Sequence, residues 1–76
     1  MFDELDIVAL AHDLKNNNLK AGDIGAVVHT YNDRKAVEVE FVNAEGKTVA
    51  LITLKTSDIR HMARNEILHV RGIATA

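Results

Sequence analysis

A pair of glycines at the start of a β-prone run constrains the fold more than any other feature of this chain. Gly22 and Gly25 stand three residues apart, and the residues that follow, as far as Tyr31, are mostly strand formers. A glycine inside such a run lets a strand bend sharply or carry a bulge. We therefore predict a turn at Gly22 and a bent strand over Ile24–Tyr31, as in a small barrel.

The next run alternates apolar and acidic residues, in the order Val37, Glu38, Val39, Glu40 and Phe41. A period of two is expected when one face of a strand lies on the core and the other lies in water. We predict this strand over Ala36–Val42. A hairpin loop follows it, in which Gly46 can take a positive φ angle at little cost.

The strand predicted over Thr48–Lys55 is apolar on both faces. Val49 and Leu51 lie on the face opposite to the residues expected to face the core, which are Ala50, Ile52 and Leu54. A strand that is apolar on both faces is usually covered on both. The cover is either a segment of this chain, near Phe2 and Leu5 or in the last strand, or another protein chain.

The rest of the chain predicts a first strand, a polar loop, a helical turn and a last strand. The first strand covers Asp6–Ala11, and the asparagine-rich residues 15–18 favour a loop. Ser57 and Asp58 favour a tight turn or one helical turn over residues 56–60, and the last strand is predicted over Glu66–Gly72. We expect one all-β domain over residues 1–76, a small SH3-like (KOW-like) barrel of about five strands with a helical turn before the last.

Four segments, residues 5–10, 19–28, 37–42 and 49–54, together resemble a family of small bacterial proteins catalogued as a domain of unknown function. The resemblance covers about residues 5–60, with a weaker echo in residues 66–71. It implies an SH3-like barrel and transfers no catalytic or binding residues to this chain. Members are often encoded beside another small gene, which implies a pairing of the toxin–antitoxin or immunity type.

Composition excludes several classes of protein. The chain has no cysteine, so neither a disulfide nor a cysteine-based zinc site stabilises it. Its acidic N-terminus lacks the basic segment of a secretory signal. The longest apolar run, Ile7–Ala11, is far shorter than the roughly 20 residues that span a bilayer. We expect a cytoplasmic protein without membrane association.

The charges are distributed unevenly along the chain. Residues 1–48 carry nine acidic and five basic side chains, whereas residues 49–76 carry two acidic and four basic ones, and the formal net charge is −2. The acidic front and the basic tail either attract each other within the fold or offer a partner two faces of opposite sign. A negative net charge does not favour non-specific binding to nucleic acid.

The residue types that commonly serve in catalysis or metal binding do not form a recognisable motif in this chain. The four histidines stand singly, at His12, His29, His61 and His69, without the close spacing that zinc ligands usually show. The single serine, Ser57, lies in an expected turn and lacks the glycine-framed surroundings of a catalytic nucleophile. Glu38 and Glu40 are expected on the solvated face of their strand. We expect neither enzymatic activity nor a metal or other cofactor.

The remaining function classes are binding functions. Our first hypothesis is a module that binds another protein, such as the product of an adjacent gene, through Val49, Leu51, Asp3, Glu4, Asp6, Arg60, Arg64 and Arg71. The alternative is a KOW-like module that binds RNA or a ribonucleoprotein through Tyr31, Arg34, Arg60, Arg64 and Arg71. A third hypothesis is a structural barrel that associates with copies of itself.

Overall fold

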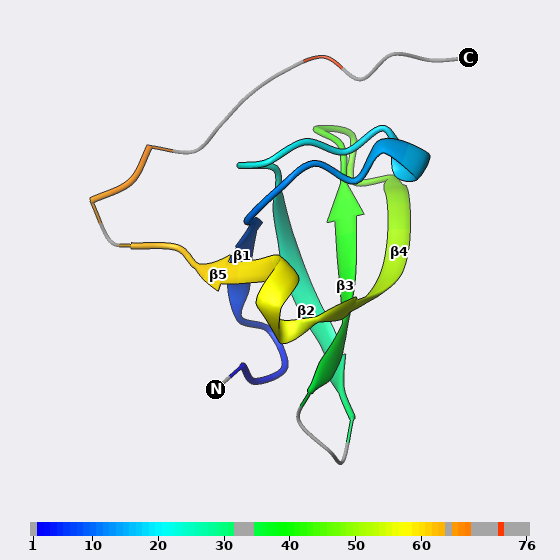
Figure 1. Cartoon of the computed structure of the whole chain (residues 1–76). Helices are drawn as coiled ribbons and strands as arrows, with labels where there is room; N and C mark the ends of the chain where they lie inside the picture. Colours follow the sequence, from blue (N-terminus) through cyan, green and yellow to red (C-terminus); the bar gives the residue numbers. More distant parts are fainter. Residues whose placement is uncertain (1, 32–34, 64, 68–71, 73–76) are drawn as a thin grey trace.

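The computed structural model describes residues 2–31, 35–63, 65–67 and 72. Five antiparallel strands in these residues form one sheet in the order β4-β3-β2-β1-β5 (Figure 1). The strands are β1 (Ile7–Leu10), β2 (Ile24–Thr30), β3 (Ala36–Val42), β4 (Thr48–Lys55) and β5 (Ile59–His61). Two short 3-10 turns, η1 (Lys15–Asn17) and η2 (Thr56–Asp58), complete the regular structure of the described residues. The all-β prediction is confirmed, although no pairing among the described residues joins β4 to β5 to close a barrel.

The central strand β2 pairs with β1 at its start and with β3 along the rest of its length. Ala26 is the residue shared by both ladders, since it lies opposite Ile7 of β1 and Glu40 of β3. Just before it, a Cβ atom at Gly25 would lie 2.6 Å from Cγ1 of Val39. The close approach of β2 and β3 therefore requires a glycine here. The bulge in β2 occurs later, between Val27 and His29.

The core is formed by the apolar residues of one face of each strand. The alternation of β3 is confirmed, because its apolar set is buried and its acidic set is not. The described core residues are Val8, Leu10, Leu19, Val27, Val37, Val39, Phe41, Leu54 and Ile59. The inward residues of β4 contribute as predicted, with Ala50 and Ile52 packed against this cluster at its margin.

The polar loop between β1 and β2 is held closed by backbone and side-chain hydrogen bonds. Leu14 and Leu19 form an isolated antiparallel bridge around η1, and Asn18 takes a left-handed conformation with φ of 57°. Leu19 is thereby buried in the core. Asp23 stabilises the turn that follows, because its carboxylate accepts a hydrogen bond from the backbone N–H of Lys20.

The last strand lies earlier in the chain than predicted. The helical turn over residues 56–58 is confirmed, but β5 begins directly after it at Ile59, which lies opposite Leu10 of β1. The carbonyl of Asp58 accepts a hydrogen bond from Ala11, so the turn places the chain at the free edge of β1. Of the strand predicted over Glu66–Gly72, residues 68–71 lie outside the described residues, and Glu66 and Ile67 are not in a strand.

Candidate functional site

One row of residues crosses four strands on the face of the sheet that points away from the core. Ile7 lies opposite Ala26, Ala26 opposite Glu40, and Glu40 opposite Leu51. Residues that lie opposite each other in an antiparallel sheet project from the same face. Because the neighbouring residues Val8, Val27 and Val39 are buried, this row faces outward.

Four aliphatic side chains on this outer face are substantially exposed. Ile7 is 49% exposed, Leu51 55%, Val42 52% and Val28 36%. Val42 is two residues after Glu40 on β3 and therefore projects from the same face. It lies opposite Thr48 of β4. Val28 is the unpaired residue of the β2 bulge. We call these four residues the outer apolar face, and exposed apolar surface of this kind commonly marks an interaction site.

Two carboxylates lie on the same face, Glu40 between Ala26 and Leu51 and Glu38 between His29 and Thr53. Glu40 accepts a 2.6 Å hydrogen bond from the hydroxyl of Thr48, and Glu38 accepts one of 3.4 Å from the hydroxyl of Tyr31. Both glutamates are half-buried, and within the described parts of the chain neither forms an ion pair. The outer face is therefore apolar at its margins and negatively charged at its middle.

The partner-binding residues predicted on β4 lie apart from the acidic ones predicted at the N-terminus. Leu51 is exposed and Val49 half-buried, Val49 being the unpaired residue of a second bulge opposite Val42. No described segment covers Leu51, and Leu5 is 81% exposed rather than packed on β4. Phe2 instead stacks on the ring of His61, with centroids 4.3 Å apart.

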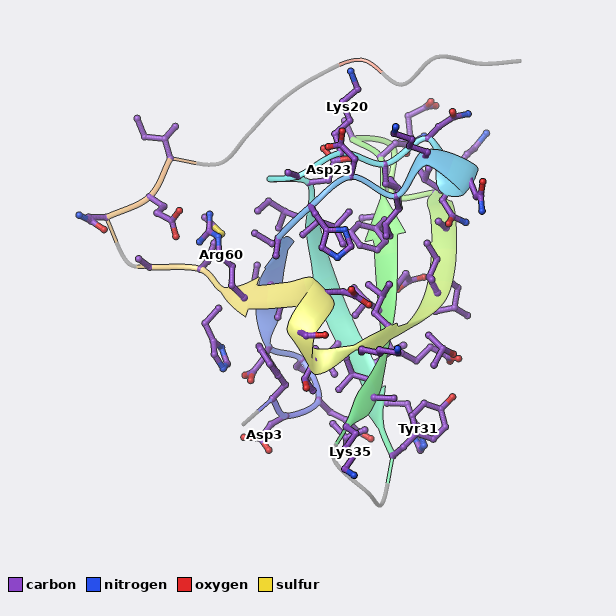
Figure 2. The ribbon with its side chains drawn as sticks, in the orientation of Figure 1. Asp3, Lys20, Asp23, Tyr31, Lys35 and Arg60 are labelled. Carbon is purple, nitrogen blue, oxygen red and sulfur yellow. The ribbon has the colours of Figure 1, made fainter. Side chains whose placement is uncertain are left out.

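The predicted acidic residues lie in the turn before β1. Asp3 and Glu4 are exposed, and Asp6 is half-buried. The carboxylate of Asp6 accepts a hydrogen bond from the backbone N–H of Asp3 and lies 4.0 Å from Nδ1 of His61. This turn adjoins β1, whereas Leu51 lies on β4 at the far end of the strand order. Figure 2 shows Asp3 at the start of the chain, apart from Tyr31.

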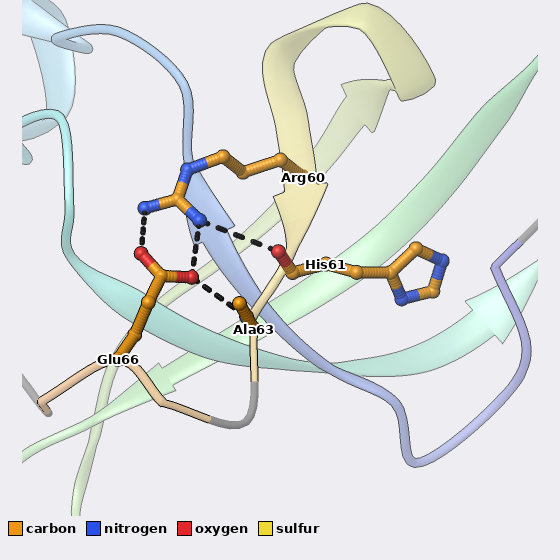
Figure 3. Close-up of polar contacts among 4 residues, drawn as sticks. All are labelled: Arg60, His61, Ala63 and Glu66. Atoms are coloured by element: carbon orange, nitrogen blue, oxygen red, sulfur yellow. Dashed lines mark hydrogen bonds and ion pairs between the residues drawn. The ribbon is translucent and has the colours of Figure 1, made fainter.

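Only one arginine of the predicted basic strip lies in the described residues, and its charge is already paired. Both guanidinium Nη atoms of Arg60 donate 2.7 Å hydrogen bonds to the two carboxylate oxygens of Glu66 (Figure 3). The ion pair lowers the pKa of Glu66 to about 2 and raises that of Arg60. Arg34, Arg64 and Arg71 lie outside the described residues. Figure 2 shows Arg60 and Tyr31 well apart.

A polar contact that the sequence did not indicate joins the β1–β2 loop to η2. Nε2 of His12 lies 2.7 Å from a carboxylate oxygen of Asp58, and Nδ1 lies 3.1 Å from the carbonyl of Asp13. Since both ring nitrogens face acceptors, the protonated imidazole satisfies both contacts, and these contacts raise the pKa of His12. The residues are 46 positions apart, so no local spacing pattern could have indicated the pair.

The described residues include no group of three or more potential metal ligands drawn from His, Cys, Asp and Glu. His69 lies outside them. In the same part of the chain, no helix has the length and apolar character needed to cross a bilayer.

The comparison with family models identifies the relationship of this chain to other proteins. The model of the family described as "Domain of unknown function (DUF4926)" matches residues 4–61. This match contains all five strands and ends at the last residue of β5, which agrees with the extent of the sheet. Comparisons with curated proteins and with solved structures gave no match. The chain therefore belongs to the family described as a domain of unknown function, DUF4926.

Proposed function

We propose that this protein is a non-catalytic bacterial module that binds another protein, the product of a neighbouring gene, in the cytoplasm. In this pairing it acts as the neutralising partner, as an antitoxin or immunity protein does. The observation that supports the proposal best is the outer apolar face, because it gathers exposed aliphatic side chains from four strands on one surface. Such a surface is energetically unfavourable in water unless a partner covers it.

We also propose that the sheet is an SH3-like barrel. Three features of the connectivity support this: the long loop between β1 and β2, the 3-10 turn directly before β5, and the pairing of β5 with β1. The shared role of β2, which pairs with β1 and β3, is consistent with a sheet that curves back on itself. The outer apolar face then lies on the convex side of this curve.

Covering the outer apolar face contributes a modest free energy to the contact with a partner. Full burial of a Val, Leu or Ile side chain contributes roughly 1.5–3 kcal/mol. Because Ile7, Val42 and Leu51 are each about half exposed, covering them contributes on the order of 1 kcal/mol per residue. The adjacent polar atoms of Glu38 and Glu40 then set which partner fits.

The test is co-expression with the neighbouring gene product and measurement of the affinity of the purified pair. We expect Leu51→Ser to weaken the complex severalfold, since it removes one of the apolar contacts at the margin of this face. Ile67→Ser is the matched control, because Ile67 is 93% exposed and lies outside the sheet. Equal affinities for the wild type and Leu51→Ser, with circular dichroism unchanged, would contradict the proposal.

Self-association is a second candidate, favoured by the position of β4. This strand is eight residues long, lies at the edge of the sheet and carries no charged residue from Thr48 to Leu54. Natural edge strands usually carry charges or prolines that prevent pairing with another copy. Light scattering at two protein concentrations decides between a monomer and an associating species. RNA binding through the arginines remains a prediction, and the engagement of Arg60 with Glu66 does not favour it.

A further inference from the structure

The environment of Glu40 limits what can cover the outer apolar face. Its carboxylate is half-buried and lies between Ala26 and Leu51 in the row that crosses the sheet, with the exposed Val42 two residues away. Its hydrogen bond from Thr48 satisfies one carboxylate oxygen. A carboxylate that is partly exposed keeps part of its hydration.

A partner that covers this face removes that water. Burying a carboxylate is strongly unfavourable unless a cation or several hydrogen-bond donors replace its hydration. Lys47 directly precedes β4, Lys55 ends it, and His29 lies opposite Glu38. None of the three forms an ion pair with Glu38 or Glu40 among the described contacts. The complementary charge is therefore expected from the partner.

The same carboxylates disfavour the other occupants. A second copy stacked on this face would bring Glu38 and Glu40 of both copies together, and like charges at close range are destabilising. Nucleic acid would place phosphates against them. An aliphatic partner without a charge would bury the two carboxylates with no positive charge to compensate them. Only a segment that is both cationic and apolar matches the described surface.

We propose that the outer apolar face binds a protein segment in which lysine or arginine side chains alternate with aliphatic ones. The cations pair with Glu38 and Glu40, and the aliphatic side chains pack on Ile7, Val28, Val42 and Leu51. This inference rests on the proposed protein-binding function and specifies the chemistry of the partner. Charge-assisted hydrogen bonds to carboxylates give such a contact its specificity.

The probe is a hexapeptide that alternates lysine and valine, titrated into the isotopically labelled full chain at low ionic strength. We expect amide chemical-shift changes in residues 38–42 and 49–53. Matched hexapeptides that alternate glutamate with valine, or lysine with serine, should bind at least tenfold more weakly. The double variant Glu38→Gln/Glu40→Gln should weaken binding of the lysine–valine peptide at least tenfold. Glu45→Gln, which removes one charge in the β3–β4 turn, is the control and should not.

The inference is overturned if the lysine–valine peptide causes no shifts, if the glutamate–valine peptide binds equally well, or if the double variant keeps full affinity. The neighbouring gene product then separates the two proposals. If Leu51→Ser weakens that complex but Glu38→Gln/Glu40→Gln does not, protein binding stands and the charge requirement is wrong. If neither substitution weakens it, both proposals are wrong.

Discussion

Gly25 illustrates how a single missing side chain determines where two strands can meet. A Cβ atom there would lie 2.6 Å from Cγ1 of Val39 and 3.0 Å from the carbonyl oxygen of Glu40. Val39 is fully buried and β-branched, so its side chain cannot easily rotate away. The backbone oxygen of Glu40 can move only if β3 moves with it.

We expect Gly25→Ala to destabilise the fold by about 1–3 kcal/mol, which is typical of overpacking in a well-packed core. Urea denaturation measures this change. Gly72→Ala is the control, because a Cβ atom at Gly72 has no neighbour within 4 Å. Equal stabilities for the two variants would show that β2 and β3 separate at little cost.

His12 makes the stability of the fold depend on pH. The side-chain hydrogen bond with Asp58 raises the pKa of His12 above the ordinary value of 6.5. A raised pKa means that the folded state binds the proton more tightly than the unfolded state. The stabilising contribution is therefore complete below about pH 6.5 and is lost as the pH rises through the higher pKa of the folded protein.

We expect the wild type to be more stable than His12→Gln at pH 5 and this difference to shrink by pH 8. Thermal melts of both proteins across this range measure it. An NMR titration of His12 gives the folded-state pKa directly and should show a lower value in Asp58→Asn. A stability difference that does not change with pH would rule out the imidazolium contact.

The segment after β5 is held against that strand by one side chain. Glu66 accepts hydrogen bonds from the guanidinium of Arg60 and from the backbone N–H of Ala63, and its own N–H donates to the Ala63 carbonyl. The hydrogen bonds that the carboxylate accepts, first that from Arg60 and then that from Ala63, lower the pKa of Glu66 from 4.5 to about 2. The contribution to stability is thus present above pH 4.5 and is lost as the pH falls toward 2.

We expect Glu66→Gln to be less stable than the wild type at pH 7 by a small amount, because the pair is exposed to solvent. The difference should vanish near pH 2, where the wild-type carboxylate becomes protonated. Chemical denaturation at both pH values provides the comparison. A difference that persists at pH 2 would assign the effect to packing rather than to charge.

The position of the fifth strand can be tested by substitution of two isoleucines. Ile59 is buried and lies opposite Leu10, whereas Ile67, in the strand expected from the sequence, is 93% exposed. We expect Ile59→Ala to destabilise the protein by about 2–5 kcal/mol and Ile67→Ala to change stability by less than about 0.5 kcal/mol. Equilibrium unfolding of the two variants decides, and the reverse order would place the last strand at residues 66–72.

At the scale of the whole molecule, the sheet formed by the described residues has two apolar faces of different kinds. The inner face is the core, and the outer face collects Ile7, Val28, Val42 and Leu51 around two carboxylates. We expect Leu51→Ser to leave stability within about 0.5 kcal/mol and Leu54→Ser to cost several kcal/mol, because only Leu54 is buried. Thermal unfolding tests this, and comparable losses for both would mean that Leu51 belongs to the core.

Much of the sheet is predictable from local pattern alone. The alternation around Val39 and the apolar run around Leu51 predict β3 and β4 with the bounds that the structure has, and β2 is predicted to within one residue. The glycine at residue 46, with φ of 80°, takes the predicted conformation. These features follow from side-chain periodicity and backbone sterics, which act between neighbouring residues.

The location of β5, the row that joins Ile7 to Leu51 and the contact of His12 with Asp58 could not be derived in this way. Each brings together residues that are far apart in the chain. Strand register, and hence the composition of an outer face, depends on which distant segments pair, and a local pattern carries no record of that choice. Periodicity specified β2, β3 and β4, and long-range pairing placed β5 and assembled the strands into a surface.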